Sequence, residues 1–259
     1  MSEPKETIVD TPAGPMRVWE KGSGAKIGYF AGVGGLPRWT PFLDALARTR
    51  HVVAPSLAGF PGGPSGDNLD DNLDRIVAAH DALTAAGLAG ADLIGASVGG
   101  ALAAEVAALW PADVKRLVLI APFGLFDEGD PVADIFAQRP GGLSSALSMK
   151  DKELDAYLAA PEGMAGIDWQ VSTLRANVAA ANIIWPLGET GLRKRLGRIS
   201  APTLLVWGEG DRVVPPGYAQ SFSKGIAGKT SIRTVANAGH MAEFDQPEAV
   251  AKAVGEFLG

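Results

Sequence analysis

The chain reads Asp92-Leu93-Ile94-Gly95-Ala96-Ser97-Val98-Gly99-Gly100-Ala101 where a short apolar run meets an Ala-rich segment. An apolar strand that passes through Gly-x-Ser-x-Gly directly into a helix predicts a very sharp turn with Ser97 at its centre. Such a turn strains the serine backbone, and it requires small residues two positions away on each side, here Gly95 and Gly99. We therefore expect the Ser97 hydroxyl to stand exposed above the edge of a sheet, as a nucleophile would.

The glycines also have a purely structural interpretation, because small residues at this point allow a helix to pack closely on a sheet. In either case the first turn of the helix leaves backbone N–H groups without intrahelical partners. The N–H of Val98 is one of them, and it could point at an oxygen atom that develops negative charge. Val98 is therefore a candidate oxyanion donor.

Outward from this segment, short β-branched runs alternate with Ala/Leu-rich stretches, which predicts strands and crossover helices around a mainly parallel sheet. The predicted strands are Thr7–Asp10, Met16–Glu20, Ile27–Phe30, Val52–Pro55, Asp92–Ile94, Val114–Ala121, Thr203–Trp207 and Ser231–Val235. The first two are separated by too few residues for a crossover, so we expect an antiparallel hairpin. The predicted helices of this core are Leu69–Ala86, Val98–Trp110 and Glu248–Leu258.

The region 123–200 breaks the alternation. Gly and Pro divide it into short helical segments, for which we expect Pro131–Gln138, Leu143–Ser148, Lys152–Leu158, Trp169–Ile184 and Thr190–Leu196. We therefore expect a core domain built from residues 1–122 and 201–259, with a helical lid at 123–200 inserted between two strands of its sheet.

A serine hydroxyl is a poor nucleophile unless a base takes its proton, and the chain has 3 histidines. His51 heads a strand and His80 lies within a helix, so both are best interpreted as structural. His240 follows the last predicted strand in Asn237-Ala238-Gly239-His240-Met241, in a loop at the carboxyl edge of the sheet. His240 is therefore the predicted general base.

A general-base histidine needs a carboxylate that fixes its tautomer. Asp211 comes just beyond the strand Thr203–Trp207, which gives the chain order Ser97, Asp211, His240. Glu209 and Asp127 are the alternatives for this carboxylate, and a turn-stabilising role is the structural alternative for Asp211.

Three motifs together, Gly95-Ala96-Ser97-Val98-Gly99-Gly100, Trp207-Gly208-Glu209-Gly210-Asp211 and Ala238-Gly239-His240, resemble those of capped enzymes of the α/β-hydrolase fold superfamily. The resemblance extends from Thr7 to Leu258. It implies an eight-stranded, mostly parallel sheet with an antiparallel second strand, flanking helices and a helical lid after the sixth strand.

The resemblance also implies a second oxyanion donor in the loop after the third strand, which by position is the backbone N–H of Val33. Ala31 stands there where relatives commonly have histidine, which puts the packing of this loop in doubt. Residues that would line an apolar substrate pocket between lid and core are Trp39, Phe123, Trp169, Trp185 and Met241. Each of these is equally well explained as ordinary core.

Composition excludes several classes of function. The 259 residues carry a formal net charge of -6, without the basic patch expected of a protein that binds nucleic acid or anionic membranes. The chain has no cysteine, which removes thiolate metal sites and cysteine nucleophiles. No stretch approaches the ~18 apolar residues of a membrane span, and the polar start Met1–Glu6 is unlike a signal peptide. We expect a cytoplasmic protein that needs no metal or organic cofactor; the oligomeric state is left open.

The leading hypothesis is a serine hydrolase that cleaves an ester-like carbonyl of an apolar acyl compound through an acyl-enzyme. Within the resemblance, a serine nucleophile argues against haloalkane dehalogenases and epoxide hydrolases, which use aspartate. A carbon–carbon bond hydrolase of diketone-type substrates with the same three residues is the first alternative. Ala96 and Met241 depart from the usual pattern of that group. A non-catalytic ligand receptor on this fold is the second alternative.

Overall fold

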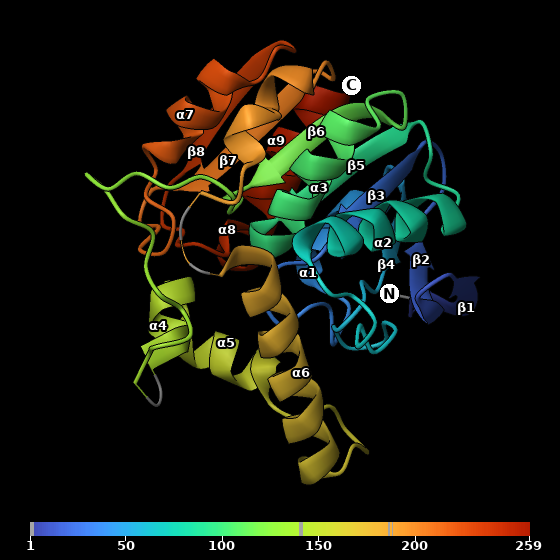
Figure 1. Ribbon diagram of the computed structural model, residues 1–259. Coiled ribbons are helices and arrows are strands. Elements are labelled where there is room, and N and C mark those ends of the chain that lie inside the picture. Colours follow the sequence, from blue (N-terminus) through green and yellow to red (C-terminus); the bar gives the residue numbers. More distant parts are fainter. Residues whose placement is uncertain (1–2, 140–141, 186, 188) are drawn as a thin grey trace.

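The computed structural model describes residues 3–139, 142–185, 187 and 189–259. Within these residues the strands form one eight-stranded sheet in the order β1-β2-β4-β3-β5-β6-β7-β8 (Figure 1). The strands are β1 (Lys5–Thr11), β2 (Gly14–Lys21), β3 (Lys26–Phe30), β4 (His51–Pro55), β5 (Ala91–Ala96), β6 (Val114–Ile120), β7 (Thr203–Gly208) and β8 (Thr230–Val235).

The strand directions follow the sequence prediction. β1 and β2 form an antiparallel hairpin, and β2 is also antiparallel to β4. All pairings from β4 through β3 to β8 are parallel. The eight predicted strands, the hairpin and the antiparallel second strand are therefore confirmed.

Helices flank the sheet on both faces. They are α1 (Pro41–Ala47), α2 (Asn72–Ala85), α3 (Ser97–Leu109), α7 (Tyr218–Gly225), α8 (Ala242–Asp245) and α9 (Pro247–Leu258). The prediction missed α1, α7 and α8, which are short. The prediction also started α2 too early, because Asp71 and Asp74 form a reciprocal capping box that fixes the first turn.

Alternation along the central strands divides the apolar core into two layers. In β6, Leu117 and Leu119 pack with α2, α3 and α7, whereas Val118 and Ile120 face α1 and α9. Both faces of the strand are buried, which is why these strands appear in the sequence as continuous apolar runs. Because β5, β6 and β7 run parallel, the carboxyl ends of β5 and β7 lie at the same edge of the sheet. The loops at this edge can carry polar side chains.

The helices α4 (Gly142–Leu147), α5 (Asp151–Leu158) and α6 (Gly166–Ile184) come between β6 and β7 in the sequence. They project from the layered core (Figure 1). Leu174 and Val178 on α6 remain exposed. No helix in the described part of the chain is long and apolar enough to cross a membrane. The function of the inserted helices as a lid stays a prediction.

Two of the helices predicted for this region are wrong. Residues Pro131–Gln138 are not helical, because the Ala133 N–H donates to the Val213 carbonyl and the Asp134 carboxylate takes the N–H of Phe136. The helix predicted at Thr190–Leu196 is replaced by two short 3₁₀ turns, Leu192–Lys194 and Leu196–Arg198.

Candidate active site

Ser97 occupies the strained turn that the Gly-x-Ser-x-Gly pattern predicts. Its φ of 53° lies in the left-handed region, which a non-glycine residue rarely adopts. A Cβ at Gly99 would lie 2.3 Å from the Ala31 carbonyl oxygen, and one at Gly95 would lie 2.6 Å from Cβ of Ala103. Glycine is therefore required on both sides of the serine, since any side chain would collide with β3 or α3.

A chain of hydrogen bonds joins Ser97, His240 and Asp211. The distance from Ser97 Oγ to His240 Nε2 is 2.8 Å, and that from His240 Nδ1 to Asp211 Oδ2 is 3.0 Å. The three residues are only 5%, 1% and 7% exposed, so water competes little for these bonds. The arrangement has the geometry that general-base activation of a hydroxyl requires.

The loop after β7 fixes the orientation of the Asp211 carboxylate. Its Oδ1 accepts the N–H groups of Val213 and Val214 at 2.8 and 3.0 Å, which leaves Oδ2 for the imidazole. The two alternative acids lie elsewhere. Glu209 is exposed, and the Asp127 carboxylate accepts from Gly129 N–H in its own loop.

The other histidines are engaged in structural contacts. His51 Nε2 lies 2.9 Å from Glu20 Oε2 on the neighbouring strand. His80 pairs with Asp113 at 2.8 Å and stacks on Trp110 with the ring centroids 4.1 Å apart. His240 is thus the histidine that the structure brings to Ser97.

The loop after β3 lies directly against the serine. A Cβ at Gly32 would be 3.0 Å from Ser97 Cβ, and the Gly35 N–H donates to the Gly32 carbonyl, which closes a turn over Val33. Val98 is fully buried in the first turn of α3. The backbone segments that carry the two predicted oxyanion donors therefore both border Ser97.

The five predicted pocket residues divide into two groups. The Phe123 ring lies 5.4 Å from the His240 imidazole, and Met241 directly follows that histidine. Of the other three, Trp39 and Trp169 are hydrogen-bonded away from Ser97 and His240. Trp39 donates its indole N–H to Asp44, Trp169 donates its own to the Leu158 carbonyl, and Trp185 is 56% exposed at the end of α6.

The sequence interpretation missed two buried carboxyl groups just after His240. Glu243 lines a cavity of about 20 Å³ together with Val33, Met241 and Tyr157, a space large enough for about one water molecule. Asp245 is fully buried and accepts hydrogen bonds from two separate segments. The signal was present, since the two acidic residues stand among the apolar residues Met241, Ala242 and Phe244.

Burial raises the pKa of Glu243 from its ordinary value of 4.5 to about 7, and the nearby Asp245 carboxylate adds to the shift. A hydrogen bond from Tyr29 and the proximity of His240 oppose it. At a pH between these two pKa values, the folded chain keeps the Glu243 proton while the unfolded chain loses it. The free energy of unfolding therefore falls as pH rises through this range. Above pH 7 the penalty is constant.

We expect the Glu243→Gln variant to lack this dependence. The difference in unfolding free energy, variant minus wild type, should increase by about 2–3 kcal/mol between pH 5 and pH 8. This figure follows from the two pKa values at about 1.4 kcal/mol per pH unit. Urea unfolding of both proteins at each pH measures the difference. Parallel pH profiles for the two proteins would show that Glu243 titrates normally.

The described residues hold no cluster of three or more His, Asp or Glu side chains suited to a metal ion.

Comparison with known proteins identifies the family of this architecture. The model of the alpha/beta hydrolase family matches residues 29–253. Among curated proteins, the chain is 24% identical over 245 residues to the monoacylglycerol lipase ABHD6 of Homo sapiens, with 85% of this chain and 71% of the relative covered. It is 26% identical over 239 residues to the 2-hydroxymuconate semialdehyde hydrolase of Pseudomonas sp. (strain CF600), with 88% and 83% covered.

A solved structure with a similar fold is that of the CarC enzyme, a His-tagged serine hydrolase involved in carbazole degradation. The TM-score is 0.79 at 26% sequence identity, and the match covers 98% of both chains. The relatives thus include both a lipase and a hydrolase of a semialdehyde.

Proposed function

The chain belongs to the alpha/beta hydrolase family, and on this basis we propose that it is a serine hydrolase that cleaves ester-like carbonyl compounds through an acyl-enzyme. The observation that carries the proposal is the buried hydrogen-bond chain from Ser97 through His240 to Asp211.

Proton transfer follows from the two bonds of the imidazole. Asp211 accepts from Nδ1–H, so the tautomer with a free lone pair on Nε2 is favoured, and that nitrogen faces Ser97 Oγ at 2.8 Å. Nε2 takes the hydroxyl proton as Oγ attacks the carbonyl carbon, and it then returns the proton to the leaving alcohol oxygen. A water molecule repeats the sequence on the acyl-enzyme.

Two backbone N–H groups, those of Val33 and Val98, would bind the negatively charged oxygen of the tetrahedral intermediate. The support is positional: the turn at Gly32–Gly35 and the first turn of α3 both lie against Ser97. Because the donors are backbone groups, Ala31 in place of the usual histidine does not remove them.

An apolar acyl group suits the surroundings of the site. Phe123 and Met241 lie next to the imidazole and would offer apolar surface to such a group. The helices α4–α6 would act as the lid over this group.

Cleavage of a carbon–carbon bond with the same residues is the second candidate. It is favoured by the similarity to the 2-hydroxymuconate semialdehyde hydrolase. The similarity to named enzymes disfavours the third hypothesis, a non-catalytic receptor.

A substrate screen tests the proposal. We expect hydrolysis of p-nitrophenyl esters of increasing acyl length to be faster than cleavage of a panel of lactones and vinylogous diketones, with the Ser97→Ala protein as the control. Product analysis that finds acids released only from the diketones would instead establish carbon–carbon cleavage.

A further inference from the structure

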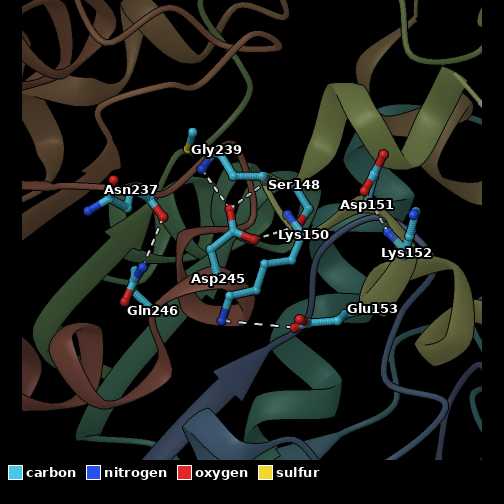
Figure 2. Close-up of polar contacts among 10 residues, drawn as sticks. Ser148, Lys150, Asp151, Lys152, Glu153, Asn237, Gly239, Asp245 and Gln246 are labelled. Atoms are coloured by element: carbon cyan, nitrogen blue, oxygen red, sulfur yellow. Dashed lines mark hydrogen bonds and ion pairs between the residues drawn. The ribbon is translucent and has the colours of Figure 1, made fainter.

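Asp245 is a buried carboxylate that the mechanism above does not use. It is 0% exposed at the end of α8. Its Oδ1 accepts from the Ser148 hydroxyl, and its Oδ2 accepts the N–H groups of Gly239 at 2.7 Å and Met149 at 3.1 Å (Figure 2). A buried carboxylate is costly unless its oxygens are hydrogen-bonded, so these three donors hold it in place.

The three donors come from two distant segments of the chain. Gly239 immediately precedes His240, whereas Ser148 and Met149 follow α4 in the inserted region. The residue on the other side of the histidine is held in the same way, because the Met241 N–H donates to the Leu147 carbonyl at 2.8 Å. The backbone on both sides of His240 is thus linked to the inserted region by hydrogen bonds. The link at Gly239 runs through the Asp245 carboxylate, and the link at Met241 is direct.

Ser148 also holds the end of α4 and the turn after it, which are the parts of the inserted region that contact Asp245. Its hydroxyl oxygen accepts the Lys150 N–H at 2.9 Å while donating to Asp245, and its own N–H closes the last turn of α4 on the Ser144 carbonyl. Figure 2 shows the Asp245 carboxylate between Gly239 on one side and Ser148 on the other. A shift of α4 would therefore move the Asp245 carboxylate and, with it, the backbone at Gly239.

The inserted region is also tied to the loop after β3. Arg38 donates to the carbonyls of Ala156, Tyr157 and Ala159 at the end of α5. The Tyr157 ring packs on Phe244 of α8 with centroids 5.4 Å apart. The helices α4 and α5 thus contact both loops that border Ser97.

We propose that Asp245 is a positioning residue for His240, and that through it the place of the imidazole depends on the inserted region between β6 and β7. The inference rests on the proposed function of His240. It means that α4 and the turn after it contribute to proton transfer, rather than only covering a substrate. Deletion of the insertion would then impair chemistry as well as selectivity.

Three variants test the proposal with p-nitrophenyl acetate, whose acyl group is small enough that substrate access is not limiting. In Asp245→Ala all three bonds are lost, and we expect kcat to fall by about 100-fold with KM changed by less than about 2-fold, as for a catalytic group displaced by about 1 Å. Ser148→Ala removes one of the two bonds that Asp245 accepts from the inserted region and keeps the one from the Met149 N–H, so we expect a smaller loss of about 3- to 10-fold by the same argument.

Asp245→Asn should recover most of the activity that Asp245→Ala loses. Its amide oxygen can accept the N–H groups of Gly239 and Met149, and its amide N–H can donate to Ser148 Oγ. The matched control is Asp92→Asn, which disturbs a carboxylate that is also buried, in an ion pair with Arg116 at the other end of β5. It should leave kcat unchanged.

A second readout does not depend on turnover. The proton shared by His240 Nδ1 and Asp211 should give a downfield ¹H NMR signal, and we expect it to shift or broaden in Ser148→Ala and Asp245→Ala but not in Asp92→Asn. The alkaline and acid limbs of the pH profile of kcat/KM should move in the same two variants.

An unchanged kcat and an unchanged downfield signal in folded Ser148→Ala and Asp245→Ala would overturn the proposal. So would an equal loss of kcat in Asp92→Asn, since that would indicate general destabilisation. If Asp245→Ala does not fold, Ser148→Ala and Asp245→Asn decide the question. A wild-type protein that cleaves no ester and is not labelled at Ser97 would refute the proposed function instead, and the NMR signal would still test the role of Asp245.

Discussion

Alanine at position 97 is expected to lower kcat for ester hydrolysis by on the order of 10⁴–10⁶-fold, with little change in KM. It is also expected to abolish covalent labelling by an alkyl phosphonate or sulfonyl fluoride probe. The reason is that the Ser97 hydroxyl lies 2.8 Å from a buried imidazole, so it is activated as a nucleophile, and alanine leaves that imidazole with nothing to deprotonate. Steady-state kinetics and the intact mass after probe treatment measure the two effects.

Serines of the inserted region provide the matched controls for this experiment. The Ser144 hydroxyl donates to Asp155 and that of Ser145 donates to the Gly142 carbonyl, so neither faces a histidine. Ser144→Ala and Ser145→Ala should therefore keep wild-type labelling and kcat, provided that they fold. Probe labelling that persists in Ser97→Ala would place the nucleophile on another residue.

The sheet could be predicted because its evidence is local. The central part of each middle strand is buried on both faces, so a run such as Leu117–Ala121 appears as unbroken apolar sequence. The position of Ser97 follows from the same kind of evidence, since the glycines that its turn requires are within two residues of it. Asp211 and His240 could be selected as candidates because each lies in the loop that follows a strand of the parallel part of the sheet.

The features that sequence could not indicate depend on contacts between distant segments. Asp245 and Ser148 are hydrogen-bonded although 97 positions separate them. Helical pattern at Pro131–Gln138 was overridden by the Val213 carbonyl, which takes the Ala133 N–H. Trp185 was assigned to the pocket by chain position alone, and its exposure depends on how α6 ends.

Asparagine in place of Asp211 is expected to leave the fold intact and to lower kcat by on the order of 10³–10⁴-fold. The surroundings of the carboxylate fix which way the amide turns. Oδ1 accepts two backbone N–H groups, those of Val213 and Val214, so the amide oxygen of the variant must stay there. Its NH₂ group then takes the place of Oδ2, 3.0 Å from His240 Nδ1.

An NH₂ donor at this point selects the imidazole tautomer with a bare Nδ1 and a proton on Nε2. That Nε2–H can only donate to Ser97 Oγ, so it cannot take the proton that the hydroxyl must lose. The loss should therefore fall on kcat, with thermal stability close to that of the wild type, and Glu209→Gln and Asp127→Asn serve as controls that keep full activity. An inactive Asp127→Asn beside an active Asp211→Asn would transfer the role to Asp127, although the carboxylate of Asp127 is engaged by Gly129 in its own loop. Because the orientation of the amide is set by two buried N–H groups rather than by the histidine, the structure predicts a wrong tautomer and not merely a weaker hydrogen bond.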